Sequence, residues 1–256
     1  MRLGLTWIFV CGVLGVLASA PVRADAKATA KPDLDAAMRR FDDLYRSKSS
    51  IARLEMTVVT PRNTRELRLQ AHTHGQDKAL IVIESPARDK GTATLRVDDN
   101  LWNYLPRIAR TIRVPPSAML SSWMGSDFTN DDLVHSSSYA DDFRASLVGD
   151  APGGGKLIRL DAKSDTVGLW KRIDVVFNDD LTLPLRAEYY DRRMRHARSM
   201  VFDDLKEFDG RRIPTRMTLT PLDKPGQKTV VHYLDIDFDV AVPDSTFSLS
   251  QLERAR

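Results

Sequence analysis

Apolar and polar residues alternate along the chain from Ile51 onward, and this period of two constrains the fold more than any other feature of the sequence. In the first run every second position is apolar, namely Leu54, Met56 and Val58. Further alternating runs follow at 66–72 and 79–83. Side chains with this period point to opposite faces of a β-strand. We therefore expect half-buried antiparallel strands in a meander, with five or six strands before Val114.

The second half of the chain repeats the pattern. Seven further strands are expected at residues 139–148, 156–162, 169–177, 183–190, 194–208, 211–221 and 228–240. The Asp209-Gly210 pair is a strong hairpin signal between two of them. Because open sheet edges promote aggregation, such a meander must close or be covered. The sequence predicts a mainly β fold with few helices, in which one curved antiparallel sheet forms an incomplete, half-open β-barrel.

Two segments interrupt the alternation. Residues 33–46 carry apolar side chains at spacings of three and four, with Asp33 placed to cap the first turn, which predicts an amphipathic helix. Residues 115–135 are apolar but follow neither period, and a long connection of this kind usually has a function. We expect the helix and this short lid insert to cover the half-open barrel and leave a cavity. A turn at 243–247 is expected to place Phe247 and Leu249 in the core.

The N-terminus has the pattern of an export signal. Arg2 precedes an uncharged apolar stretch from Leu3 to Ala18, which is shorter than the ~20 residues of a membrane-spanning helix. Small residues favour cleavage after Ala24 or Ala26, and an uncleaved membrane anchor is the alternative. We expect a signal peptide at 1–24, a disordered leader at 25–32, a single domain at 33–256, and export to the periplasm.

Composition excludes several classes of function. Cys11 is the only cysteine and lies inside the apolar stretch, so the exported chain would have no thiol for a disulfide, a metal or catalysis. The position of Cys11 also argues against lipidation. Loss of residues 1–24 would remove Arg2 and Arg23 and no acidic residue, which lowers the formal net charge from +3 to +1. We therefore expect no nucleic-acid partner.

Residues with catalytic or metal-binding chemistry lack the arrangement that either function needs. His72 and His74 would share a strand face, but no third ligand accompanies them. Paired aspartates such as Asp131-Asp132 fall mostly at expected turns or strand ends, where aspartate bonds its own backbone. Gly125-Ser126-Asp127 lacks the second glycine of a nucleophile elbow. We expect no metal, no cofactor and no enzymatic activity.

Basic residues gather in the last third of the chain, and two interpretations stay open. They are Arg192, Arg193, Arg195, Arg198, Arg211, Arg212 and Arg216. They would form a solvated surface that protects sheet edges, or they would dock to anionic lipid head groups or an acidic partner.

Two motifs carry the strongest functional signal. The first is Trp102-Asn103-Tyr104-Leu105-Pro106, and the second runs from Met124 to Leu133 as M-G-S-D-F-T-N-D-D-L. They resemble the LolA-like outer membrane lipoprotein-sorting proteins, which pair a W-x-Y-L-P strand with an M-G-S-D-F-[ST]-x-x-D-L stretch. The likeness extends less sharply over residues 33–252. We find no counterpart for the arginine that locks the lid of the dedicated carrier of that group.

The resemblance implies a LolA/LolB/RseB-like fold and a non-enzymatic periplasmic carrier or chaperone. It would bind a lipoprotein acyl chain or a lipid in a hydrophobic cavity for sorting toward the outer membrane. Methionine and aromatic side chains suit such a cavity because they repack around variable shapes. The candidate ligand-binding residues are Trp102, Tyr104, Leu105, Met119, Leu120, Trp123, Met124 and Phe128. The candidate residues of the lid motif are Gly125, Ser126, Asp127, Asp132 and Leu133.

The implied partners are a lipoprotein or lipid cargo and an inner-membrane transporter, and the chain is expected to be a monomer. An alternative of a different class is an envelope sensor or adaptor that recognises acylated or unfolded proteins and signals to a membrane partner. A hydrolase is the third and weakest interpretation.

Overall fold

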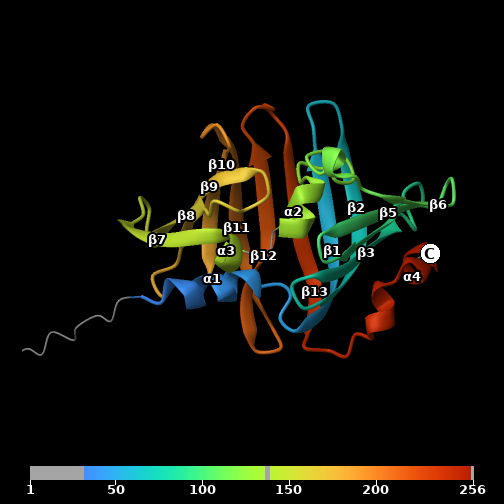
Figure 1. Ribbon diagram of the computed structural model, residues 1–256, viewed down its shortest axis with the longest axis horizontal. Helices are drawn as coiled ribbons and strands as arrows, with labels where there is room; N and C mark the ends of the chain where they lie inside the picture. The colour runs from blue at the N-terminus through green and yellow to red at the C-terminus, as the bar shows by residue number, and fades with distance from the viewer. Residues whose placement is uncertain (1–31, 136–138, 255–256) are drawn as a thin grey trace, which may run out of the picture. The chain divides into compact units, whose positions relative to one another are not determined.

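One antiparallel β-sheet dominates the computed structural model, which describes residues 32–135 and 139–254 (Figure 1). Its first six strands are β1 (Ser49–Val59), β2 (Thr64–His74), β3 (Lys78–Ser85), β4 (Ala93–Val97), β5 (Asn100–Leu105) and β6 (Arg110–Arg113). The other seven are β7 (Phe143–Asp150), β8 (Lys156–Ala162), β9 (Trp170–Phe177), β10 (Pro184–Asp191), β11 (His196–Phe208), β12 (Arg211–Pro221) and β13 (Lys228–Phe238).

The sheet is a meander joined in its middle by its first and last strands. The strand order is β6-β5-β4-β3-β2-β1-β13-β12-β11-β10-β9-β8-β7, so β1 pairs with β13 while β6 and β7 form the two edges. Figure 1 shows the central strands standing upright and the outer strands β5 and β7 running across them, as expected of a strongly twisted sheet. The prediction of a mainly β, open antiparallel sheet with few helices is confirmed.

Helix α1 (Leu34–Asp42) follows the predicted amphipathic pattern over nine residues. The Asp33 carboxylate caps it by accepting a hydrogen bond from the backbone N of Ala36 at 2.9 Å. The helix ends earlier than predicted because residues 43–46 turn back on themselves, with the backbone N of Arg46 bonded to the carbonyl of Asp43. Its buried face, which includes Met38, packs on the half of the sheet formed by β7 to β12.

Within the described part of the chain, three hydrophobic clusters stabilise the fold. The first lies between α1 and the strands of the second half, and the second lies on β1, β2 and the neighbouring strands. Phe128, from the insert at 115–135, packs against both of these clusters. The third cluster lies under the C-terminal segment and includes Tyr104, Phe247 and Leu252.

The segments around the insert contain short helices. They are η1 (Pro116–Ala118), α2 (Asn130–His135) and α3 (Tyr139–Asp142). The prediction of a strand over 139–148 was therefore wrong at its start, where α3 precedes β7. The physical reason is that Asp42 caps the start of α3. Its two carboxylate oxygens accept hydrogen bonds from the backbone N of Tyr139 at 2.8 Å and of Ala140 at 3.0 Å.

The C-terminal segment forms η2 (Asp244–Phe247) and α4 (Leu249–Arg254). Phe247 is buried as predicted, but the placement of Leu249 in the core was wrong, because its side chain is 46% exposed. The helical period of α4 instead buries Leu252 completely, three residues further on.

The expected signal peptide and the leader up to residue 31 lie outside the described residues. Among the residues that the structure describes, no helix has the length and apolar character needed to cross a membrane.

Candidate functional site

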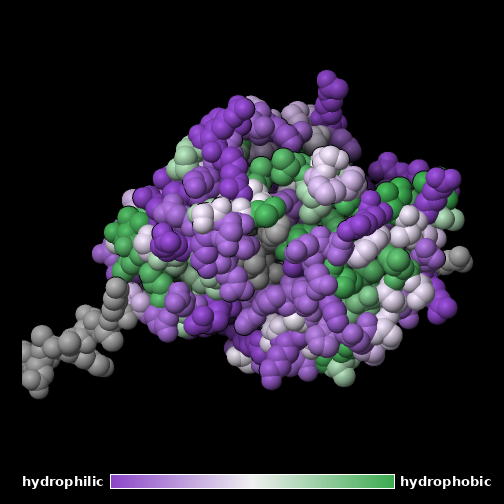
Figure 2. Space-filling model, in the orientation of Figure 1, coloured by the Kyte–Doolittle hydropathy of each residue, from purple (hydrophilic) through white to green (hydrophobic). Residues whose placement is uncertain are grey.

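A cavity of about 220 Å³ lies between the sheet, α1 and the insert. Its lining is mostly apolar, and the first strands contribute Ala52, Leu54, Met56, Leu69 and Ile81. A smaller apolar cavity, of about 150 Å³, is already large enough to hold benzene. Hydrophobic residues also gather at the centre of the face shown in Figure 2, around the position of α2 in Figure 1. The geometry therefore offers a binding site for an apolar group.

The insert forms the roof of the cavity through Trp123, Phe128 and Leu133. The Trp123 side chain is only 6% exposed, and its indole Nε1 donates a hydrogen bond to the Oγ1 of Thr94 on β4 at 3.0 Å. A buried indole N–H needs such a partner. Trp123 is thus held against the sheet while its ring contributes to the lining.

Met124 and Asp127 connect the insert to two further strands. Arg65 on β2 donates from Nη1 to the Met124 carbonyl at 2.8 Å, next to Gly125, whose φ of +72° favours glycine. On the other side, the Oγ1 of Thr229 on β13 accepts from the backbone N of Asp127 at 2.9 Å and donates to its Oδ2 at 2.8 Å. The turn of the lid motif is therefore fixed from both sides.

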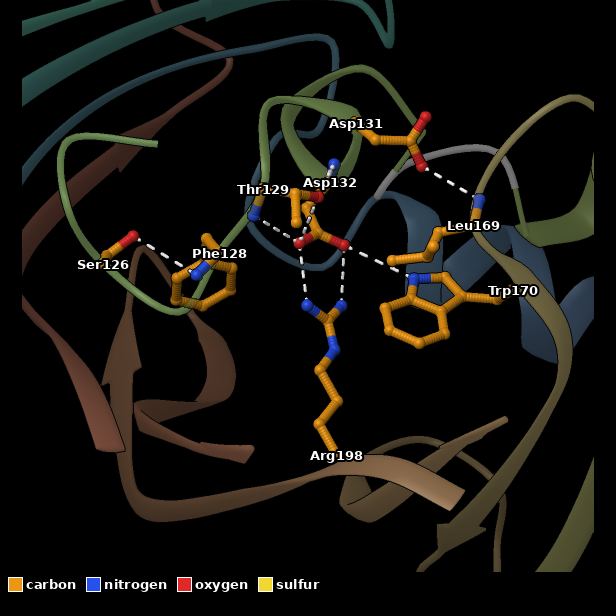
Figure 3. A network of polar contacts seen from close by, with 8 residues as sticks. All are labelled: Ser126, Phe128, Thr129, Asp131, Asp132, Leu169, Trp170 and Arg198. Carbon is orange, nitrogen blue, oxygen red and sulfur yellow. Dashed lines mark hydrogen bonds and ion pairs between the residues drawn. The ribbon is translucent and has the colours of Figure 1, made fainter. Parts of the chain in front are cut away.

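A buried ion pair makes the strongest connection between the insert and the sheet (Figure 3). The two Nη atoms of Arg198 on β11 contact the two carboxylate oxygens of Asp132 on α2, at 2.6 and 2.7 Å. Thr129 donates from its backbone N and its hydroxyl to Oδ2 of Asp132, at 2.8 and 2.9 Å. The Arg198 guanidinium also stacks over the rings of Trp170 and Tyr189.

Electrostatics around this pair keeps both partners charged. Burial alone would raise the pKa of Asp132, but the charge and hydrogen bonds of Arg198, with those of Thr129, hold it below its usual value. For Arg198, burial favours the neutral form, but the charge of Asp132 outweighs it and raises the pKa. A pair of this kind is costly to desolvate and more costly to break. It also lies in the cavity lining, so the roof is fixed at the wall of the binding space.

Sequence reasoning assigned Asp132 to the lid motif but treated Arg198 as part of a diffuse basic surface. The two residues are far apart in sequence, so no local spacing connects them. One signal was nevertheless present. Arg198, Met200 and Phe202 occupy every second position of one strand, and all three are buried and line the cavity. An arginine in register with inward-facing apolar residues points into a core.

The other residues predicted for the site lie elsewhere. Trp102 and Tyr104 belong to the cluster covered by the C-terminal segment, and Leu105 ends β5 half-buried. In the insert, Leu120 is 59% exposed and Met119 is half-buried. The structure describes all of the predicted site residues, and those that line the cavity are Trp123, Phe128, Asp132 and Leu133. Ser126 supports the turn, because its hydroxyl donates a hydrogen bond to the Trp123 carbonyl at 2.7 Å.

Residues from α1 and the following turn also line the cavity, although no sequence pattern marked them as site residues. Tyr45 stacks on Tyr233 at 4.7 Å and donates from its hydroxyl to the carbonyl of Pro214. Burial raises the pKa of Asp42 to about 6, even though the backbone N–H groups of Ala140 and Tyr139 oppose the rise. Arg46 completes this side of the cavity.

The remaining polar candidates are of two kinds, possible metal ligands and surface arginines. Within 32–135 and 139–254, no group of three or more His, Cys, Asp or Glu is placed to hold a metal ion. Several arginines of the last third form exposed ion pairs, such as Arg216 with Asp203 and Arg211 with Asp239. Exposed pairs of this kind are typical of a solvated surface.

Several solved structures have a similar fold. A DUF1329 family protein from Desulfovibrio piger has 25% identity and a TM-score of 0.77, over 85% of this chain and 97% of that one. A domain described as an outer membrane lipoprotein-sorting protein, from Vibrio parahaemolyticus, has 23% identity and a TM-score of 0.72, over 85% and 97%. A LolA superfamily protein from Nitrosomonas europaea has 19% identity and a TM-score of 0.71, over 84% and 97%.

The fold is LolA-like, as the two sequence motifs predicted. A family model that is described as "Uncharacterized protein" matches residues 75–254, well over half of the sequence. The chain belongs to the family that this model describes. No curated protein matches the sequence. In this LolA-like chain, the matched residues include both motifs, the insert and Arg198.

Proposed function

We propose that this chain is a non-enzymatic periplasmic carrier or chaperone that holds the acyl chain of a lipid or lipoprotein in the cavity beneath the insert. The observation that carries the proposal is the apolar cavity whose roof is formed by Trp123, Phe128 and Leu133. The name of the Vibrio relative refers to outer membrane lipoprotein sorting, and the proposal extends that role to this chain. Periplasmic location follows from the expected signal peptide.

Burial of an acyl chain supplies enough free energy without any chemical step. Each methylene moved out of water contributes about 0.8 kcal/mol, so a dozen contribute roughly 10 kcal/mol before the costs of ordering. The cavity is smaller than such a chain requires, so loading requires the insert to move outward or the sheet to widen. The insert is attached to the sheet by polar contacts and by the packing of Trp123 and Phe128, so loading has to loosen both.

The direct test is analysis of what the protein carries. Protein purified gently from the periplasm is extracted with organic solvent, and the extract is analysed by mass spectrometry beside an equal amount of Trp123→Ala protein. We expect a stoichiometric lipid or acylated peptide from the wild type and a reduced amount from the variant. A clean wild-type extract, together with no uptake of a fluorescent fatty acid, would contradict the proposal.

A transfer assay separates a carrier from a sensor. Loaded protein is mixed with acceptor vesicles, and the cargo in the vesicle fraction is measured over time. A carrier is expected to deliver about one cargo molecule per protein. Retention of the cargo on the protein would favour the alternative function of an envelope sensor.

A further inference from the structure

The guanidinium of Arg46 lies at the edge of an apolar cavity and has no partner among the described residues. It follows α1 and contributes to the cavity lining. Its Nη1 atom is buried and has no hydrogen-bond partner, and its guanidinium forms no ion pair with a described residue. Arginine is almost never buried without a partner, because the charge loses its hydration and gains nothing in return.

Two buried arginines near the cavity, Arg96 and Arg198, have oxygen partners that Arg46 lacks. Arg198 has a bidentate carboxylate partner in Asp132. Arg96 on β4 donates to the carbonyl of Asp98 at 3.0 Å and to the carbonyl of Leu133 at 3.3 Å. The Nε atom of Arg198 also lacks a partner, but both of its Nη atoms bond the Asp132 carboxylate. Of these three arginines, Arg46 differs in that no carboxylate or carbonyl of the described residues accepts a hydrogen bond from its guanidinium.

The charged and titratable groups that act on Arg46 do not neutralise it. Burial lowers the pKa of Arg46, and Tyr233, Asp42 and Asp77 oppose this only in part. Both oxygens of Asp42 are already occupied by the backbone N–H groups at the start of α3. Arg96 adds a second positive charge close by, since burial and the charge of Arg46 lower the pKa of Arg96 to about 10.

We propose that the cavity binds an amphiphile with one anionic head group, a long-chain carboxylate, with its head at Arg46 and its chain along the apolar lining beneath Trp123. This inference rests on the proposed function and names the class of its ligand. A guanidinium offers paired N–H donors that match the two oxygens of a carboxylate. An acyl chain held in an ester or amide linkage has no such charge. A free fatty acid therefore suits this cavity better than the lipid group of an acylated protein.

The test compares two probes of equal chain length, laurate and lauryl alcohol, by calorimetry at neutral pH. The wild type is expected to bind laurate at least about 10-fold more tightly than the alcohol, since a hydrogen bond between charged groups is roughly twice as strong as one between neutral groups. In Arg46→Gln this preference is lost, while affinity for the alcohol stays within about 2-fold. Arg46→Lys keeps part of the preference. Arg40→Gln, at an exposed position on the same helix, is the matched control.

A thermal unfolding experiment without ligand checks that the variant folds. Arg46→Gln is expected to unfold at the same temperature as the wild type or higher, because it removes a partly buried positive charge that has no partner. Equal affinity of the wild type for both probes, or an unchanged preference in Arg46→Gln, overturns the inference and leaves the carrier function standing. Failure of the wild type to bind either probe contradicts both.

Discussion

Arg198 and Asp132 form a buried, bidentate ion pair that joins the middle of the sheet to the insert above the cavity. Each side chain is less than a tenth exposed, so neither charge is solvated by bulk water. The pair therefore holds the insert closed only while both partners are present, and loss of one partner leaves a buried charge.

Replacement of either partner is expected to destabilise the protein strongly. Asp132→Asn and Arg198→Met should each lower the free energy of unfolding by about 3–5 kcal/mol, and the double variant should lose clearly less than the sum of the two. A double-mutant cycle measured by urea denaturation gives the coupling. Additive effects would show that the pair does not act as a unit.

Asp42 is expected to make stability fall as the pH rises. The pKa of Asp42 is about 6 in the folded protein, above the ordinary value of 3.8. The stabilising contribution of Asp42 to the free energy of unfolding is therefore complete below pH 3.8 and is lost as the pH rises through 6. At 1.36 kcal/mol per unit, the difference corresponds to at most about 3 kcal/mol. The stability of Asp42→Asn relative to wild type should therefore rise by up to that amount between pH 4 and pH 7.5.

Denaturant unfolding of both proteins across this range measures the effect. Asp35→Asn, at an exposed position on the same helix, controls for the loss of one carboxylate. If the difference in free energy of unfolding between Asp42→Asn and wild type is the same at every pH, the pKa of the buried carboxylate is not raised.

Two tryptophans provide a matched test of the site. Trp123 lines the cavity, whereas Trp102 packs in the cluster under the C-terminal segment. Trp123→Ala is expected to weaken binding of a fluorescent fatty acid by at least about 10-fold, since a large apolar surface is lost from the lining. Trp102→Ala should leave the affinity nearly unchanged. Equal losses in both variants would place the binding site elsewhere.

Gly125 is expected to resist substitution. Its φ of +72° costs an L-residue about 1–2 kcal/mol, and a Cβ there would lie 3.4 Å from Nη1 of Arg65. Gly125→Ala should therefore loosen the insert. Hydrogen exchange should become faster over residues 118–134 and stay unchanged in β11 and β12. Unchanged protection in the insert would show that the turn tolerates the strain.

The regular part of this fold was accessible from the sequence because alternation and turn chemistry act locally. The strands at Lys156–Ala162 and Arg211–Pro221 have the predicted bounds, and each follows a glycine-containing turn, such as Asp209-Gly210. The predicted start of the strand at 139–148 was wrong because the carboxylate of Asp42, far away in the sequence, caps a helix there. Local patterns carry no information about a partner so far away in the chain.

The candidate site was predicted only in part for the same reason. Residues of the insert, such as Trp123 and Phe128, were found because a motif and an unusual composition marked them. Arg198 and Arg46 were not, because their importance depends on what faces them across the cavity. The strand motif at Trp102 was assigned to the site, but it lies against the C-terminal helix instead.

The sheet ends in two strands, β6 and β7, that do not pair with each other. In a closed barrel, expansion of the interior would have to break a ladder of backbone hydrogen bonds. In this open sheet the two halves can move apart without breaking such a ladder. The width of the interior is therefore set by side-chain packing and by the Arg198–Asp132 ion pair that joins the sheet to the insert. An open sheet of this kind can accommodate ligands of different thickness.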